Sequence, residues 1–304
     1  MKIAVIGAGA VGCFYGGMLA RAGQDVVLIG RPRHVDAIRA RGLRFESRLF
    51  DEQVTIAASA NAASVEDADI VLVCVKSVDT EQVAEEIRGH LKRDALVVSL
   101  QNGIDNACQL EEALARPVIP AAVYVASEMA GDGHLRHHGR GDLVIGQEQG
   151  SELVARLFHD AGVPTVVSAN VARPLWEKLI LNCAYNALSA IVNLPYGEIR
   201  GIASAEEAMQ NLIAECLAVA RAEGVDIDLD AASQLERIRR TIPLGQYSSM
   251  AQDFARGRAS EIAALNGAIV RRGNARGVPT PVNQLVVALV ELLERHPRSQ
   301  PGTL

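Results

Sequence analysis

The sequence predicts an α/β domain built on a parallel sheet, followed by an all-α domain. Up to about residue 167, short apolar strands alternate with helical segments at the spacing of βαβ units. A glycine-rich turn joins the first strand to the first helix. Beyond that point, apolar residues recur only with helical periodicity. We therefore expect two domains, residues 1–168 and 169–304, because the chain is longer than one core usually organises.

In the first domain, the predicted strands are short apolar runs, and the helices stop at glycines or at the next strand. Lys2–Ile6 has the pattern of a buried strand, and Val11–Ala22 that of a helix closed by Gly23. The elements expected next are the strand Val26–Ile29, the helix Val35–Arg41, a β-excursion over Leu43–Ile56 with a turn around Phe50–Glu52, the strand Ile70–Val75, the helix Thr80–Leu91, the strand Leu96–Leu100 and edge strands within Val118–Gln147.

The second domain is predicted to contain helices alone. They are expected at Ala172–Ile191, Ser204–Glu223, Ala231–Arg240, Ser249–Arg256, Ala259–Arg276 and Pro281–Arg295. The last segment, His296–Leu304, contains two prolines and no periodicity, so we expect a frayed tail.

Composition narrows the class of protein. The net charge of −6 and a pI near 5.7 argue against nucleic acid as the main partner. Five widely spaced cysteines without a C-x-x-C pair are typical of free thiols in the cytoplasm. The glycines of the first segment argue against a secretory signal, and no later apolar run is long enough for a membrane span. We expect a soluble cytoplasmic protein.

The turn after the first strand carries a G-x-G-x-x-G motif that runs into the first helix. The first glycine permits the tight turn, the second lets the backbone approach a pyrophosphate, and the third lets helix and strand pack closely. Because a strand precedes the motif and a helix follows it, a dinucleotide site is favoured over a purely structural turn. The expected cofactor-binding residues of this loop are Gly7, Ala8, Gly9, Ala10, Val11 and Gly12.

Arginines follow the second strand, where an NAD enzyme usually carries Asp or Glu for the ribose hydroxyls. The guanidinium of Arg31 suits a 2′-phosphate through paired N–H donors. The alternative is that Arg31 and Arg33 are ordinary solvated charges at the start of a helix. We interpret the pattern as a preference for NADP(H).

Lys178, Asn182 and Asn186 recur at i, i+4 and i+8 in an otherwise apolar helix, so they share one face. Buried polar groups need partners, and these three could simply link core helices. They could instead form a ligand site with a lysine acid and asparagine donors. Only four of the 30 basic residues are lysines. A lysine amine, unlike a guanidinium, can exchange a proton near neutral pH, which favours the ligand site.

Other polar residues are weaker candidates. Lys76 and Asn102 each follow a predicted strand, where ligands bind in parallel sheets, although Asn102 could equally be a turn residue. Glu261 lies one turn into its predicted helix and could be a surface group that complements the helix dipole.

Two further features are set aside. The histidines of His134-x-x-His137-His138 lie in a glycine-rich turn without clustered Cys or carboxylates, so we expect no metal there. Cys183 is expected to pack rather than to act as a nucleophile, since no histidine is near it in sequence.

In their order and spacing, these motifs resemble those of the ketopantoate reductase (2-dehydropantoate 2-reductase) family over nearly the whole chain. The motifs are the Gly7–Gly12 loop, Lys76, Gln101-Asn102-Gly103, Lys178-x-x-x-Asn182-x-x-x-Asn186, Ser248-Ser249-Met250-Ala251-Gln252-Asp253, Glu261 and Leu265-Asn266-Gly267. The resemblance implies a Rossmann-type domain, a helical domain like the C-terminal domain of 6-phosphogluconate dehydrogenase, and a substrate cleft between them.

The resemblance also implies roles for single residues. The catalytic residues would be Lys178, as general acid, and Glu261. The substrate-binding residues would be Asn102, Lys178, Asn182, Asn186 and Ser249, the last at the substrate carboxylate. Cofactor contacts beyond the glycine loop would be Arg31, Lys76, Asn102, Ala126 and Glu261.

Two positions depart from the family pattern. The family's Pro-Asn-Gly is here Pro195-Tyr196-Gly197, and its Glu-Ile-Asp is Glu261-Ile262-Ala263. We expect Tyr196 at the rim of the cleft, where it would narrow the pocket and weaken discrimination for a substrate hydroxyl. The alternative is that Tyr196 only packs the turn before the next helix.

The expected reaction is NADPH-dependent reduction of ketopantoate to pantoate, as in pantothenate biosynthesis. Hydride would come from the nicotinamide and the proton from Lys178. One alternative is a reductase of another 2-oxo acid on the same fold, and another is a protein that senses NADP(H) without turnover. The expected partner is the small-molecule 2-oxo acid, with a homodimer as one option for assembly.

Overall fold

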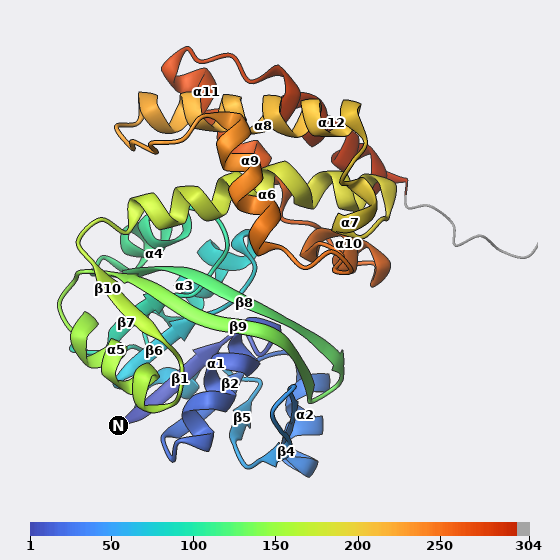
Figure 1. The fold of residues 1–304 in the computed structure, drawn as a ribbon. Coiled ribbons are helices and arrows are strands. Elements are labelled where there is room, and N and C mark those ends of the chain that lie inside the picture. The colour runs from blue at the N-terminus through green and yellow to red at the C-terminus, as the bar shows by residue number, and fades with distance from the viewer. Residues whose placement is uncertain (297–304) are drawn as a thin grey trace, which may run out of the picture. The chain divides into compact units, whose positions relative to one another are not determined.

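The computed structural model describes residues 1–296, which divide into two compact units. One unit covers Met1–Val171 and the other begins at Ala172. The first contains a sheet with helices and the second contains helices alone, so the predicted fold class is confirmed (Figure 1). The expected tail lies, after its first residue, outside the described part of the chain. No helix within residues 1–296 has the length and apolar character needed to cross a membrane.

A ten-stranded sheet organises the first unit. Its order is β4-β3-β9-β8-β7-β6-β1-β2-β5, with β10 paired to β9. The neighbours from β5 to β8 are parallel, whereas β8 and β9 form a long antiparallel pair, and β3 joins that pair in parallel with β9. The strands are β1 (Lys2–Ile6), β2 (Asp25–Ile29), β3 (Leu43–Glu46), β4 (Asp51–Val54), β5 (Ala57–Ser59), β6 (Ile70–Val73), β7 (Leu96–Ser99), β8 (Ile119–Gly131), β9 (His134–Gly146) and β10 (Thr165–Ser168).

Helices cover both faces of the central strands, because successive apolar side chains point to opposite faces. Ile3 and Val5 of β1 belong to the apolar cluster that includes α1 and α5. Ala4 and Ile6 belong to the cluster that includes α3 and α4. The helical segments are α1 (Ala10–Arg21), α2 (Pro32–Arg41), η1 (Ala62–Val65), η2 (Ser77–Asp79), α3 (Thr80–Arg88), α4 (Asn106–Leu114) and α5 (Ser151–Asp160). This is the layered arrangement of a Rossmann-type domain.

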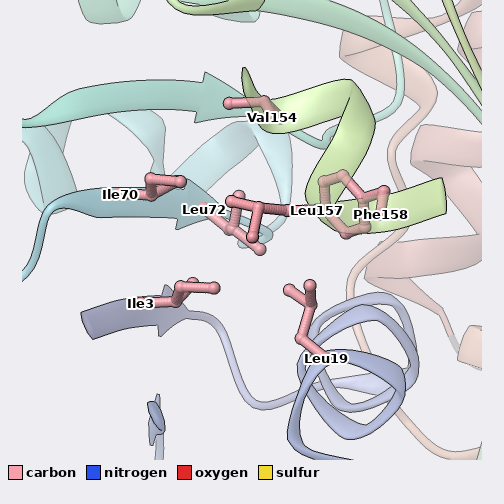
Figure 2. Close-up of a pocket in the computed structure, with 7 residues that line it drawn as sticks. All are labelled: Ile3, Leu19, Ile70, Leu72, Val154, Leu157 and Phe158. Atoms are coloured by element: carbon pink, nitrogen blue, oxygen red, sulfur yellow. The ribbon is translucent and has the colours of Figure 1, made fainter. Parts of the chain in front are cut away.

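Figure 2 shows a small hollow where α1 and α5 meet the sheet. Side chains from β1, β6, α1 and α5 point into it. The lining residues are Ile3, Leu19, Ile70, Leu72, Val154, Leu157 and Phe158. All seven side chains are hydrocarbon, so the hollow belongs to the core and offers no polar group for chemistry.

The second unit is built around α6, which packs against α8, α10 and α12. From Leu179 to Ala190 most of this helix is buried, in agreement with its nearly continuous apolar sequence. The helical segments are α6 (Ala172–Val192), α7 (Tyr196–Ile199), α8 (Ala203–Ala222), α9 (Ala231–Thr241), α10 (Ser249–Ala255), η3 (Ile262–Ala264), α11 (Asn266–Arg276) and α12 (Pro281–Arg295).

Some expected bounds are wrong. The helix predicted from Ala259 begins only at Asn266, and the short η3 precedes it. The Ser260 hydroxyl accepts the Ile262 amide at 3.2 Å, a local bond of the kind that competes with helix formation. Glu261 therefore lies before the helix and not one turn inside it. The short elements α4, α5 and β10 were not predicted from the sequence.

Candidate active site

The three glycines of the turn after β1 have different surroundings. At Gly7, where φ is +101°, an added Cβ would lie 2.7 Å from backbone atoms of Cys74 and Val75. At Gly12 it would lie 2.1 Å from the Gly7 carbonyl oxygen, whereas at Gly9 it would meet no atom within 4 Å. Gly9 caps the N-terminus of α1 without a side chain. The loop thus combines close packing at two glycines with an open approach to the helix N-terminus, which is what a pyrophosphate requires.

This difference separates folding from cofactor binding. We expect Gly9→Ala to change the free energy of unfolding by less than about 0.5 kcal/mol. It should nevertheless weaken NADPH binding roughly tenfold, because the methyl group would stand where a pyrophosphate approaches. Gly12→Ala should lower the free energy of unfolding by about 1–3 kcal/mol or more, since its neighbour is backbone. Thermal unfolding and a fluorescence titration with NADPH measure both effects, with Gly89→Ala, also in open space, as control. Equal NADPH affinity of Gly9→Ala and the unmutated protein would contradict the assignment.

The two arginines after β2 are not equivalent. Arg31 is exposed at the N-cap of α2, and no ion pair holds it within the described residues. The side chain of Arg33 is 85% exposed, and its guanidinium pairs with Asp132 in the turn between β8 and β9. Arg31 is therefore the arginine that is available to an incoming phosphate.

The carboxyl ends of β6 and β7 are tied together by a buried polar network. Gln101 donates from Nε2 to the Val75 carbonyl at 3.2 Å and to the Thr80 hydroxyl at 2.7 Å. The Thr80 hydroxyl donates in turn to Oδ1 of Asn106 at 3.1 Å. The network fixes the backbone that follows β6 and β7, where Lys76 and Asn102 lie. Both residues are half-buried, and they lie at the carboxyl ends of the strands, where parallel sheets bind ligands.

Ala126 lies on β8 beyond the stretch that pairs with β7. That pairing ends at Ser99 and Pro120, and β8 continues past the carboxyl end of β7. A register shift follows Ala126, whose partner on β9 is Gly139. Ala126 thus lies toward the end of the sheet at which the carboxyl ends of β6 and β7 are found.

On α6, the predicted polar stripe is present. Asn182 and Asn186 are only 9% and 3% exposed, and Lys178 is half-buried. The Asn182 amide makes no hydrogen bond to another described residue, yet it is not among the polar atoms sealed from solvent. Asn186 accepts the Ser248 hydroxyl at its backbone oxygen (3.0 Å) and the Tyr196 hydroxyl at Oδ1 (3.4 Å). Two carboxamides beside a lysine, with donors left over, can bind an oxygen-rich ligand.

Two adjacent serines at the start of α10 have different surroundings. Ser248 is fully buried, and its hydroxyl accepts the Ala251 amide at 3.0 Å while donating to Asn186. Its own amide donates to the Ser189 hydroxyl at 3.2 Å. Ser249, the expected carboxylate ligand, is exposed at the first position of the helix. Ser248 therefore anchors α10 to α6 and leaves Ser249 open.

The two serines should consequently respond differently to the same substitution. Ser248→Ala removes the N-cap and a buried bond between helices, so the free energy of unfolding should fall by about 1–2 kcal/mol. Ser249→Ala should change it by less than about 0.5 kcal/mol, while the KM for the oxo acid rises. Chemical denaturation and steady-state kinetics measure these quantities. A Ser249→Ala protein with unaltered KM would exclude this serine from substrate binding.

The sequence predicted that Tyr196, which departs from the family pattern, lies at the rim of the cleft. The structure shows it buried instead. It is 7% exposed at the start of α7, and its ring meets that of Tyr185 edge-on at 5.3 Å between centroids. Burial raises the pKa of the Tyr196 phenol. Glu261, by contrast, is half-buried at the start of η3.

The histidine motif lies on β9 and not in a turn, which corrects the sequence reading. His134 and His138 pair with Glu46 and Glu128, at 2.8 and 3.2 Å, and His137 donates to the Arg140 carbonyl at 2.6 Å. Among residues 1–296 no group of three or more His, Cys, Asp or Glu could hold a metal ion. His134 thus links β9 to β3, His138 links β9 to β8, and His137 bonds within β9.

Comparison with known proteins decides the family. The family model described as ketopantoate reductase PanE/ApbA matches residues 3–150, and the model of its C-terminal domain matches residues 170–294. The chain belongs to the ketopantoate reductase family. It is 33% identical to the 2-dehydropantoate 2-reductase of Halobacterium salinarum and 32% to that of Pyrococcus horikoshii; the matches cover 97% of this chain and 99% and 98% of the relatives.

Solved structures of similar proteins have the same fold. A family member from Ralstonia eutropha is 55% identical, with a TM-score of 0.93 over 97% of this chain and 99% of that one. A D-mandelate dehydrogenase solved with NADH and anilino(oxo)acetate is 26% identical, with a TM-score of 0.91 and the same coverage. As a member of this family, the chain is an oxidoreductase that uses a nicotinamide cofactor.

Several family motif residues prove to be structural in ways that sequence reasoning missed. Gln101 joins strand ends, Ser248 anchors α10, and Asn266 donates from Nδ2 to the Cys183 carbonyl of α6 at 3.1 Å. A serine directly before a helix is an N-cap signal that could have identified Ser248. Cys183 is fully buried, and burial raises the pKa of its thiol, which disfavours a nucleophile.

Proposed function

We propose that this protein reduces a 2-oxo acid, ketopantoate by preference, to the 2-hydroxy acid with NADPH. The observation that carries the proposal is the α6 stripe, in which the Asn182 and Asn186 amides have donors to spare beside Lys178. Mostly buried carboxamide N–H groups without a protein acceptor cost stability unless water or a ligand accepts their hydrogen bonds. The product would enter pantothenate biosynthesis in the cytoplasm. A second copy of the chain, in a homodimer, remains a further proposed partner.

In the proposed mechanism, the nicotinamide cofactor supplies the hydride to the carbonyl carbon. Lys178 donates a proton from Nζ to the oxygen that becomes the hydroxyl. Asn182 and Asn186 hold the substrate and stabilise the charge that develops on that oxygen. Ser249 binds the carboxylate end. Glu261 orients the substrate and the nicotinamide ring.

The first unit, Met1–Val171, would hold most of the cofactor. The pyrophosphate would bind at the open backbone of Gly9, and the exposed Arg31 would bind the 2′-phosphate. Lys76, Asn102 and Ala126 lie at or beyond the strand ends, where the rest of a dinucleotide would extend. The helical unit, which begins at Ala172, would supply Lys178, Asn182, Asn186, Ser249 and Glu261, and Asn102 of the first unit would also contact the substrate.

A panel of 2-oxo acids tests the proposal directly. The purified protein is mixed with NADPH and each acid, and NADPH oxidation is followed by absorbance. Ketopantoate is expected to give the largest kcat/KM. Tight binding of NADPH without turnover of any oxo acid would overturn the proposal in favour of a protein that senses NADP(H).

A second candidate is a reductase of a different 2-oxo acid. It is favoured by the likeness to a D-mandelate dehydrogenase and by Tyr196 and Ala263, which stand where the family pattern has polar side chains. On this alternative, phenylglyoxylate in the same panel would give a higher kcat/KM than ketopantoate.

A further inference from the structure

Tyr196 contacts a residue of the α6 stripe from inside the helical unit. Its hydroxyl lies 3.4 Å from Oδ1 of Asn186, its only hydrogen-bond partner within the described residues. The backbone of Tyr196 is held by the Gln246 carbonyl, which accepts its amide at 3.0 Å. Its ring is supported edge-on by Tyr185. The Asn186 oxygen, the Gln246 carbonyl and the Tyr185 ring together fix the position of the phenol.

A carboxamide has an acceptor oxygen and a donor nitrogen that exchange places when the group turns over. The Tyr196 hydroxyl is buried and stays protonated, because burial raises the pKa of its phenol. Its hydrogen finds an acceptor only when Oδ1 of Asn186 faces it. With the amide turned over, that buried hydrogen would have none, which is unfavourable.

With Oδ1 facing Tyr196, the amide nitrogen Nδ2 of Asn186 must point the other way. No described residue accepts a hydrogen bond from Nδ2, and this atom is not sealed from solvent. The Ser248 hydroxyl holds the backbone of Asn186 and leaves the side chain unaffected. The amide orientation thus depends on Tyr196.

We propose that Tyr196 is a positioning residue, which fixes the Asn186 amide so that its N–H donors face the substrate. This inference rests on the proposed function, since it assigns the substrate end of the amide to a 2-oxo acid. It assigns Tyr196 a role through Asn186 and not through contact with the substrate.

Kinetics of Tyr196→Phe test the role, because the substitution keeps the ring and removes the hydroxyl. The KM for the oxo acid should rise roughly three- to tenfold, the effect of one hydrogen bond. The kcat should fall as well, because Asn186 also stabilises the charge that develops on the carbonyl oxygen, whereas the KM for NADPH and the melting temperature should stay close to those of the unmutated protein. Tyr185→Phe removes the hydroxyl of the neighbouring ring, which interacts with Arg239 and not with Asn186, and should leave both KM values and the kcat unchanged. In an Asn186→Ala background, Tyr196→Phe should have no further effect on KM.

A measurement that needs no turnover separates this inference from the proposed function. In protein with ¹⁵N-labelled asparagine, the Asn186 side-chain amide is identified by its loss in Asn186→Asp. Its resonance should shift in Tyr196→Phe and not in Tyr185→Phe. An unshifted resonance would overturn the positioning role, whether or not the protein reduces an oxo acid. A shifted resonance in a protein that reduces no oxo acid would support the hydrogen bond and refute the proposed function.

Discussion

Replacing Lys178 with alanine is expected to lower kcat by a factor on the order of 10² to 10⁴, the usual contribution of a general acid. The lysine is half-buried on the same face of α6 as two buried asparagines. In that position its Nζ can donate to an oxygen held by the carboxamides. NADPH affinity, measured by fluorescence titration, should stay nearly normal, because Lys178 is not among the proposed cofactor residues and most of those belong to the other unit.

Two further lysine variants make this result specific. Lys178→Arg should restore little activity, since a guanidinium keeps its proton at neutral pH. Lys92→Ala removes a lysine whose Nζ pairs with Asp69 at 2.8 Å near the surface, and it should leave kcat unchanged. A Lys178→Ala protein with near-native kcat would show that this lysine is a structural amine.

Replacing Arg31 with aspartate is expected to change the ratio of kcat/KM for NADPH to that for NADH by about 10² in favour of NADH. The substitution removes a partner of the 2′-phosphate and adds a charge that repels it. The unmutated protein should prefer NADPH clearly. Equal use of the two cofactors by the unmutated protein would refute the assignment.

Arg33 provides the matched control for cofactor choice. Its guanidinium is already engaged by Asp132, so Arg33→Ala should leave the preference nearly intact. Arg31→Ala should weaken NADPH use without improving NADH use, because it only removes a positive charge. If the two alanine variants behaved alike, the phosphate would be recognised by the general field of the segment and not by Arg31.

The parts of the fold that were predictable depend on local sequence. The glycine loop could be recognised because its turn, close approach and helix contact are separated by a few residues along the chain. The α6 stripe could be recognised because helical periodicity brings Lys178, Asn182 and Asn186 to one face. Helices with strong periodicity, such as α12, were predicted with the bounds that the structure has.

Other parts depend on contacts between distant segments. The sequence presents Arg31 and Arg33 as equals, and only the β8–β9 turn, about a hundred residues later, engages one of them. Glu261 was placed inside a helix, since residue periodicity does not show the local serine bond that delays α11. Tyr196 was expected at a rim, yet the Tyr185 ring and the Asn186 oxygen hold it inside the helical unit.

The sequence by itself thus determined the two-part fold, the family and the residue types available for reduction of an oxo acid. Each follows from short-range patterns that the backbone turns directly into geometry. Only the tertiary structure decided which polar groups are already satisfied and which are left for a ligand. Hydrogen-bond partners such as Ser248 and Asn186 lie 62 residues apart in sequence, and their pairing depends on how the helices pack.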